Sequence, residues 1–247
     1  MVNKNKYYQG LLKKCIIVAK QAGKFLKNTK SIKVLSDRNR DIKLNVDLKS
    51  ESIIFKKLSK YYPVLSEESG GVLLKNNAVW IVDPLDGTVN YQRKIPLNCI
   101  SISLWHRKKP VLGVVYDFMR NELFTGIIGN GAKLNGKKIM ISSIKKISQS
   151  IIFTGFPVGF NLKHVYIKKF MSLLLSYKKI RLIGSAALSL AYVASGRADA
   201  YHERGIKIWD VAAGLALVKA AGGFYKIKNL KNGLDVFASN KSYINKV

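Results

Sequence analysis

Apolar residues recur along the first half of the chain with two different periods, and each period predicts one kind of element. Over residues 6–27 and again over residues 46–60, apolar side chains return every three or four positions, which predicts two helices that each bury one face. Three shorter apolar runs follow at residues 78–82, 100–105 and 111–116, and they predict strands. The first half is therefore expected to pack helices against a sheet.

The second half mixes both kinds of element. Glycines within 129–131 and the sequence LNGKK predict antiparallel hairpins, and SIIFTGFP predicts another strand. Three helices are predicted from the sequences NLKHVYIKKFMSLLLSYKK, SAALSLAYVASG and WDVAAGLALVKAAGG. Helices and strands in blocks indicate a layered α+β fold and not a regular parallel βαβ array. We expect two packed halves, residues 1–145 (α+β) and 146–247 (α/β), because no low-complexity linker divides the chain.

Basic residues dominate the charged composition. The 247 residues include 43 Lys and Arg against 14 Asp and Glu, which gives a formal net charge of +29. Such a surface attracts phosphate groups. The lysines are scattered, however, and no recognisable nucleic-acid-binding motif interleaves them with exposed aromatic residues. A solvated basic surface and weak, non-specific nucleic-acid binding therefore both stay open.

Several other protein classes are disfavoured. No apolar run has the length of a membrane span, and the N-terminus lacks the apolar core of a secretion signal, so we expect a cytoplasmic protein with no membrane contact. Cys15 and Cys99 show no metal-binding or redox spacing and are expected to be ordinary buried thiols. The three histidines lack ligand spacing among themselves, and Trp80 and Trp209 are expected to anchor the core.

Two acids follow the apolar strand in the sequence AVWIVDPLDGTVNY. The proline between them keeps Asp83 out of a helix, so Asp83 and Asp86 can converge beside the carbonyl of Leu85. Oxygen ligands of this kind suit Mg²⁺, which keeps waters that a substrate phosphate can replace. Gly87 and Thr88 would open a helix whose free N–H groups face that phosphate. The alternative is a surface turn, because Asp-Pro and Asp-Gly are common turn dipeptides.

Further acids could join this site, although each also has a structural explanation. Glu67 and Glu68 end a short apolar run, where they could equally form a surface pair. Asp47 stands where strand-like alternation passes into a helix, a good N-cap position. Asp210 stands in the first turn of a buried helix, where the dipole favours a carboxylate that can also bind a cation. The spacing matches neither an EF-hand loop, which needs a closing Glu, nor the aspartyl-phosphatase signature, whose aspartates are two residues apart.

Together these stretches resemble a known family. WIVDPLDGTVNY, SEESGG, NVD, GSAALSLAYVASGRADAYHERG and IWDVAAG are similar to motifs of the inositol monophosphatase family of Mg²⁺-dependent, lithium-sensitive phosphatases, over Asp41 to Asn240. The resemblance implies a layered α/β/α/β/α sandwich of the inositol monophosphatase and fructose-1,6-bisphosphatase type, and a homodimer. Val89 and Ser66 depart from the commonest pattern without removing a required group, and the short C-terminus leaves the dimer contacts open.

The resemblance also implies a role for each site residue. The metal ligands, most of them in the first half, would be Glu67, Asp83, Asp86, the Leu85 carbonyl and, for a second metal, Asp210. The residues that position the attacking water would be Glu67, Asp47 and Thr88. The substrate contacts would be Gly87, Thr88, Ser185, Ala186 and Glu203. The sequence SDRNRDIK would be a mobile loop that closes over the metals.

The expected reaction is hydrolysis of a small phosphate monoester by water that Mg²⁺ activates. The leading prediction is an inositol-1-monophosphatase-like enzyme acting on a polyol or sugar phosphate. The sequence VLSEES also resembles the 3′(2′),5′-bisphosphate nucleotidase branch, and histidinol phosphate or fructose 1,6-bisphosphate remain further alternatives. In another class, the chain could be a basic partner of RNA or of a transcription complex. The intact set of acids argues against lost catalysis.

Overall fold

The computed structural model describes residues 4–38, 41–74, 76–156 and 164–240. The predicted helices are confirmed, with ends that differ by a few residues. The helices are α1 (Lys4–Asn28), α2 (Asn45–Leu58), α3 (Thr88–Gln92), α4 (His164–Leu175), α5 (Ala186–Ala194) and α6 (Ile208–Ala220), with a 3₁₀ turn η1 (Ile147–Gln149). The short helix α3 is the helix that Gly87 and Thr88 were expected to open; its five residues carry too little periodicity for its end to be predicted.

The larger sheet has seven strands in the spatial order β3-β4-β5-β6-β7-β8-β9. Its strands are β3 (Val64–Ser66), β4 (Ala78–Asp86), β5 (Cys99–His106), β6 (Lys109–Asp117), β7 (Glu122–Ile127), β8 (Gly131–Leu134) and β9 (Lys137–Ile139). From β4 onward each strand pairs antiparallel with the next, whereas β3 runs parallel to β4. The predicted hairpins are the turns that flank β8.

The smaller sheet has five strands in the order β11-β10-β12-β14-β13. Its strands are β10 (Ile151–Thr154), β11 (Lys179–Arg181), β12 (Ala200–Ile206), β13 (Phe224–Asn229) and β14 (Leu234–Ser239). Strand β10 pairs parallel with β11 and β12, while β12, β14 and β13 are antiparallel. Strands β11 and β13 escaped the sequence prediction because lysines and arginine interrupt their short apolar patterns.

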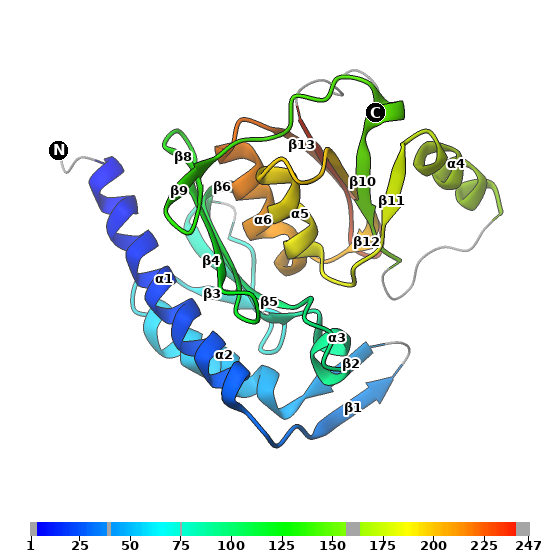
Figure 1. The fold of residues 1–247 in the computed structure, drawn as a ribbon. Helices are drawn as coiled ribbons and strands as arrows, with labels where there is room; N and C mark the ends of the chain where they lie inside the picture. Colours follow the sequence, from blue (N-terminus) through cyan, green and yellow to red (C-terminus); the bar gives the residue numbers. More distant parts are fainter. Residues whose placement is uncertain (1–3, 39–40, 75, 157–163, 241–247) are drawn as a thin grey trace.

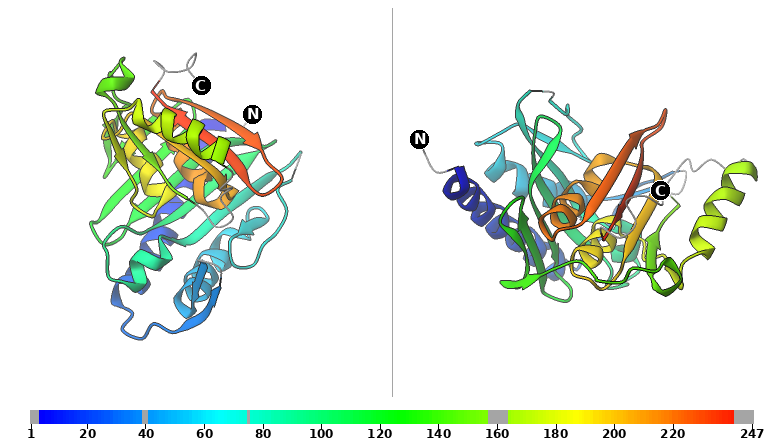
Figure 2. Two further views of the ribbon diagram at one scale, coloured as in Figure 1. Left: turned by 90° about the vertical axis from the view of Figure 1, so that its right-hand side faces the viewer. Right: turned by 90° about the horizontal axis from the view of Figure 1, so that it is seen from above.

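These elements stack in five layers, which confirms the predicted α+β sandwich (Figures 1 and 2). Helices α1 and α2 cover one face of the seven-stranded sheet, and α5 and α6 lie between the two sheets. Helix α4 covers the far face of the five-stranded sheet. Because α5 and α6 are enclosed on both sides, eight of the nine residues of α5 and eight of the thirteen residues of α6 are buried. No helix among the described residues is long and apolar enough to cross a membrane.

Close packing fixes α6 against the larger sheet. A Cβ at Gly113 of β6 would lie 2.5 Å from the carbonyl oxygen of Ala213, so only glycine lets the helix approach this far. On the other face, Trp80 is fully buried and its indole Nε1 donates to the Leu58 carbonyl at 3.1 Å, which confirms its predicted role in the core. The contact at Gly113 thus holds α6 close to the sheet at Ala213, three residues after Asp210.

Two local predictions differ from the structure. The stretch SDRNRDIK was expected as a mobile loop, but its described residues form an antiparallel hairpin of β1 (Val34–Arg38) and β2 (Asp41–Leu44); residues 39–40 lie outside the described part. Asp47 was expected as an N-cap, but α2 begins two residues earlier, and the Asp47 carboxylate reaches back to accept from the Leu44 N–H at 2.6 Å. An acid can satisfy a free N–H from inside the first turn as well as from the cap position. The C-terminal residues 241–247 also lie outside the described part.

Candidate active site

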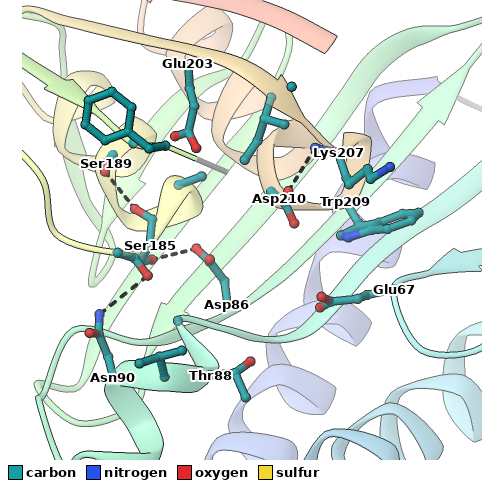
Figure 3. A pocket seen from close by; sticks show the side chains of 18 of the residues that line it. Glu67, Asp86, Thr88, Asn90, Ser185, Ser189, Glu203, Lys207, Trp209 and Asp210 are labelled. Carbon is teal, nitrogen blue, oxygen red and sulfur yellow. Dashed lines mark hydrogen bonds between the residues drawn. The ribbon is translucent and has the colours of Figure 1, made fainter. Parts of the chain in front are cut away.

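A cavity of about 550 Å³ lies where strand ends of both sheets meet the first turns of α3, α5 and α6 (Figure 3). Its walls include the end of β4, the end of β10 and the second half of β12. Most of the residues that the sequence singled out line this cavity: Glu67, Asp86, Gly87, Thr88, Ser185, Ala186, Glu203 and Asp210. The first and the last of them, Glu67 and Asp210, are 143 positions apart in the sequence, so the fold brings both halves of the chain to this cavity. Three other predicted residues, Asp47, Asp83 and Leu85, are buried and are not among the residues that line it.

The end of β4 changes direction between Asp83 and Asp86, where its pairing with β5 is irregular. The Asp83 carboxylate accepts from the Leu85 N–H at 2.9 Å, which closes a tight turn around the proline. Gly87 then has φ 88°, and a Cβ there would lie 2.7 Å from the Leu97 carbonyl oxygen. Only glycine suits this position, and its conformation directs the backbone of Thr88 into the cavity wall.

Two hydroxyl groups hold this turn in place. Ser50 of α2 donates to the Pro84 carbonyl at 2.8 Å, and Thr88 donates to the Leu85 carbonyl at 3.0 Å. A carbonyl oxygen has two lone pairs, so that of Leu85 can still face a cation while Thr88 remains bonded to it. One hydrogen bond therefore ties the turn to helix α2, and the other closes the turn itself.

The Asp86 carboxylate is held from the other half of the chain. Its Oδ2 accepts from the Ser185 hydroxyl at 2.6 Å and from the Ala187 N–H at 2.7 Å, and the Cys99 thiol lies at 3.8 Å. Ser185 is the N-cap of α5, and its Oγ accepts from the Leu188 N–H at 3.3 Å, so its proton is free to point at Asp86. The resemblance placed Ser185 among substrate contacts; in the structure its hydroxyl bonds to an acid.

Burial and mutual repulsion raise the pKa values of the clustered acids. Burial, followed by repulsion from Glu68, raises the pKa of Glu67 to about 8. Burial, followed by repulsion from Glu67, raises the pKa values of Asp83 and Asp210 well above the usual range. Burial raises the pKa of Asp86 to about 6, although its donors Ser185 and Ala187 lower it. These carboxyl groups thus sit where a positive charge would be favourable.

The donor set suits a hard divalent cation, because carboxylate and carbonyl oxygens are the ligands that Mg²⁺ and Ca²⁺ prefer. Glu67 also shares a hydrogen bond with Asp83. Among the residues that the structure describes, no three acidic, histidine or cysteine side chains converge as a finished coordination shell. A cation would therefore have to draw these carboxylates closer together.

Glu203 lines the side of the cavity that lies opposite Thr88 (Figure 3). Its carboxylate accepts from the Tyr201 hydroxyl at 2.9 Å, and burial raises its pKa to about 7. A Cβ at Gly155 would lie 2.7 Å from both Glu203 oxygens, so a side chain there would displace the carboxylate. Gly155, which the sequence did not single out, thus makes room for Glu203.

Other residues of the site also escaped the sequence prediction. The Asn90 amide donates to the Leu97 carbonyl at 2.8 Å and to the Ile183 carbonyl at 2.7 Å, and so ties the loop after α3 to the loop before α5. Its place inside the motif WIVDPLDGTVNY was the available signal. Trp209, expected as a core anchor, instead lies half-buried in the cavity wall beside Asp210 (Figure 3), because the first turn of α6 faces the opening.

Comparison with known proteins gives one consistent family. The family model "Inositol monophosphatase family" matches residues 8–239. The curated protein "Nus factor SuhB" of Xylella fastidiosa is 44% identical over 198 residues, which are 78% of this chain and 72% of that protein. The solved inositol monophosphatase of Anabaena (Nostoc) sp. PCC 7120 is 34% identical with a TM-score of 0.82, covering 96% of this chain and 93% of that one.

A further solved structure adds a metal. An IMPase/NADP phosphatase complexed with NADP and Ca²⁺ is 27% identical with a TM-score of 0.82, and the match covers 95% of this chain and 92% of that one. The fold thus occurs in a protein that has been observed with a divalent cation and a phosphorylated dinucleotide.

Proposed function

Because the chain belongs to the inositol monophosphatase family, we propose that it is a Mg²⁺-dependent phosphoric monoester hydrolase acting on a polyol or sugar phosphate of the inositol 1-phosphate type. The observation that carries the proposal is the gathering of Glu67, Asp86, Asp210 and Glu203 around one cavity. Six of the fourteen acids in a chain of net charge +29 are assigned to this site. Such a concentration of buried carboxylates is costly unless a cation or a substrate compensates it.

Each part of the cavity then has a task. Glu67, Asp83, Asp86 and the Leu85 carbonyl would hold one cation, and Asp210 would help to hold a second. When bound, Mg²⁺ neutralises the phosphate oxygens and makes the attacking water more acidic. The N–H groups of Gly87 and Thr88 bind the phosphate. These positions lie at the end of β4 and the start of α3.

The remaining residues orient water and leaving group. Asp47 and Thr88, together with Glu67, position the attacking water, so that no covalent intermediate with the protein is required. Ala186 and Glu203 face the alcohol part of the substrate, where the carboxylate accepts hydrogen bonds from hydroxyl groups. Lys207 is exposed at the rim and favours the approach of an anion.

The substrate class is tested by measuring phosphate release from inositol 1-phosphate and from 3′-phosphoadenosine 5′-phosphate, side by side with Mg²⁺. Faster turnover of the inositol ester supports the polyol assignment. A preference for the nucleotide keeps the metal ligands and moves the chain to the bisphosphate nucleotidase branch, the alternative that VLSEES favours. No release from either ester, nor from histidinol phosphate, fructose 1,6-bisphosphate or NADP, by a folded protein would contradict the phosphatase proposal.

Family-typical properties complete the proposal. We expect millimolar lithium to inhibit the enzyme, a homodimer in solution and a cytoplasmic location. Inhibition is checked by the rate at increasing lithium, and the oligomeric state by light scattering. Unchanged rates at millimolar lithium would separate this chain from the lithium-sensitive members of the family.

A second function is suggested by the names of the relatives. "Nus factor SuhB" of Xylella fastidiosa and of Escherichia coli (41% identical over 192 residues) carry a name that points to transcription. We therefore keep participation in a transcription complex as a second proposal, to which the basic surface is suited. Association with transcription proteins or RNA that survives Asp86→Asn would support it, because that substitution disables only the phosphatase site.

A further inference from the structure

A row of lysines runs along the outer face of α1. Lys6, Lys13, Lys20 and Lys27 follow one another at intervals of seven residues, and all four are exposed. Seven residues are almost two helical turns, so these side chains project from one face at a spacing of about 10 Å. The row therefore extends over roughly 32 Å, about the length of nine stacked nucleotides.

No acid within α1 balances this charge. The helix contains seven lysines and no Asp or Glu, and its first turn lacks the acid that the helix dipole favours. Lys20 and Lys24 lie one turn apart, where like charges repel. The helix is held by its apolar face against the sheet and is electrostatically strained on its outer face. A bound polyanion would relieve that strain.

The neighbouring helix α2 distributes its charges in the same way. Its acids Asp47 and Glu51 are buried, and Glu51 accepts hydrogen bonds from Ser69. Its exposed side includes Lys49, Lys56 and Lys57. Helices α1 and α2 lie side by side in the outermost layer (Figures 1 and 2), so both contribute positive charge to that layer.

Exposed aromatic rings accompany the lysines. Tyr7 is 43% exposed beside the first lysine of the row, and Phe55 of α2 is 43% exposed. Tyr61 is 39% exposed, and the ammonium group of Lys14 lies 5.0 Å from the centre of its ring. Rings on a basic surface bind single-stranded nucleic acid, because bases stack on them while the lysines contact phosphates.

This arrangement favours a nucleic acid over a membrane surface as the ligand of α1. A helix that lies on a membrane inserts its apolar face among the lipids. In α1 that face is already buried, with Leu11, Cys15, Val18, Ala22 and Leu26 all in the core. What remains outside is mostly charge, with a few separate rings and one exposed aliphatic side chain, Ile17 (56% exposed).

We propose that the outer face of α1, together with the exposed lysines of α2, is a docking surface for single-stranded nucleic acid. The phosphates lie along the row Lys6, Lys13, Lys20 and Lys27. None of the described residues that line the catalytic cavity belongs to either helix, so binding leaves the cavity accessible. The inference rests on the second proposed function, which it deepens by naming a surface and a ligand; it does not depend on the phosphatase activity.

The test compares two variants of equal charge. In the row variant, Lys6, Lys13, Lys20 and Lys27 are each changed to Gln. In the control variant, four exposed lysines far from α1 in the sequence are changed to Gln: Lys168 and Lys169 of α4, and Lys178 and Lys179 at the start of β11. Binding of a fluorescein-labelled, mixed-sequence single-stranded RNA 12-mer is measured by anisotropy between 50 and 300 mM KCl, with circular dichroism as the check on folding.

We expect the row variant to bind the 12-mer at least tenfold more weakly at 100 mM KCl, with a salt slope reduced by about 3, since each phosphate contact on a single strand contributes about 0.7. The control variant should lose less than threefold. Equal losses in both variants would show that binding follows net charge and would overturn the proposal, as would binding of anionic phosphatidylserine vesicles through the row without binding of the RNA. Unchanged phosphatase activity of the row variant would separate this result from any failure of the catalytic assignment.

Discussion

Glu67, Asp86 and Asp210 line one cavity beside strand ends, whereas the outer face of α1 carries lysines and no acid. Among acids whose side chains the structure describes, only Asp37 is exposed, and the others are buried or half-buried. The two regions thus divide the charges of the chain: carboxylates are kept inside, and ammonium groups remain on the surface. A general surplus of lysine explains the second region's charge, but it does not explain why the few acids gather at one cavity.

This difference shows which charged residues carry information about function. An exposed lysine is well solvated and costs little, so its position alone says little about function. A buried carboxylate next to others raises the free energy of the fold unless something compensates it. The cavity therefore supports a specific chemical assignment, and the α1 surface requires a comparison of matched variants.

The largest expected effect is that of Asp210→Asn. This change keeps the size of the side chain and removes a negative charge from the cavity, so we expect phosphate release with Mg²⁺ to fall by at least about 100-fold. Steady-state rates on the preferred ester measure this. Ser189→Ala is the matched control, since Ser189 also lines the cavity but only donates to the Ser185 carbonyl, at 2.7 Å. A fully active Asp210→Asn protein would remove Asp210 from the mechanism.

Ser185→Ala should have the next largest effect. The hydroxyl donates to Asp86 at 2.6 Å, and loss of a group that orients a metal ligand weakens metal binding by about 10- to 100-fold. The same change removes the N-cap of α5, at a cost of about 1 kcal/mol in unfolding free energy. Calorimetric Mg²⁺ binding and chemical denaturation separate the two effects, and Ser185→Thr should restore both. Wild-type Mg²⁺ affinity in Ser185→Ala would show that the bond does not orient a ligand.

Magnesium should stabilise the protein more as the pH rises. The pKa values of Glu67 and Asp86 are raised, to about 8 and about 6. A carboxyl group whose pKa is higher in the folded state stabilises the fold below its unfolded pKa, and this contribution is lost as the pH rises through the folded value. Without Mg²⁺, we therefore expect these groups to lower Tm between pH 5 and pH 8, and Mg²⁺ to compensate. A Mg²⁺-induced rise in Tm that is larger at pH 5 than at pH 8 would contradict this.

The smallest effect is expected on α1. In Lys20→Glu, repulsion between residues 20 and 24 becomes attraction at a favourable spacing, worth about 0.3–0.5 kcal/mol at low salt. Unfolding free energies from urea titrations at 20 mM and 500 mM NaCl measure the gain, which should shrink at the higher salt. Lys178→Glu, outside the row, is the control. A loss of stability in Lys20→Glu at low salt would mean that α1 is not strained by its charge.

Long periodic elements could be predicted from the sequence because their pattern alone determines which face is buried. Helices α1 and α2 and strands β4 to β6 were found in this way. The short elements depend on neighbours distant in sequence. Strand β11 has three residues and is stabilised by its parallel pairing with β10, and the β1–β2 hairpin contains several charged residues that mask a strand pattern. The division at residue 145 stays a prediction, since α5 and α6 pack between both sheets.

The candidate site was predictable to a similar extent. Residues that the motifs contain, such as Asp86, Gly87 and Glu203, do line the cavity. Gly155 and the bond from Ser185 to Asp86 could not be found from the sequence, because both depend on which segments the fold brings within about 3 Å. Sequence patterns indicate which residue types are present; the hydrogen bonds that orient them depend on tertiary packing.

The most direct test of the central claim is a Mg²⁺ titration of phosphate release from inositol 1-phosphate, with wild-type protein and Asp86→Asn measured side by side. We predict that wild-type release rises with Mg²⁺ to saturation and is abolished by chelation, while Asp86→Asn stays at least about 100-fold lower throughout. Release that is independent of Mg²⁺, or equal in the two proteins, would contradict the assignment of the acidic cavity as the catalytic metal site.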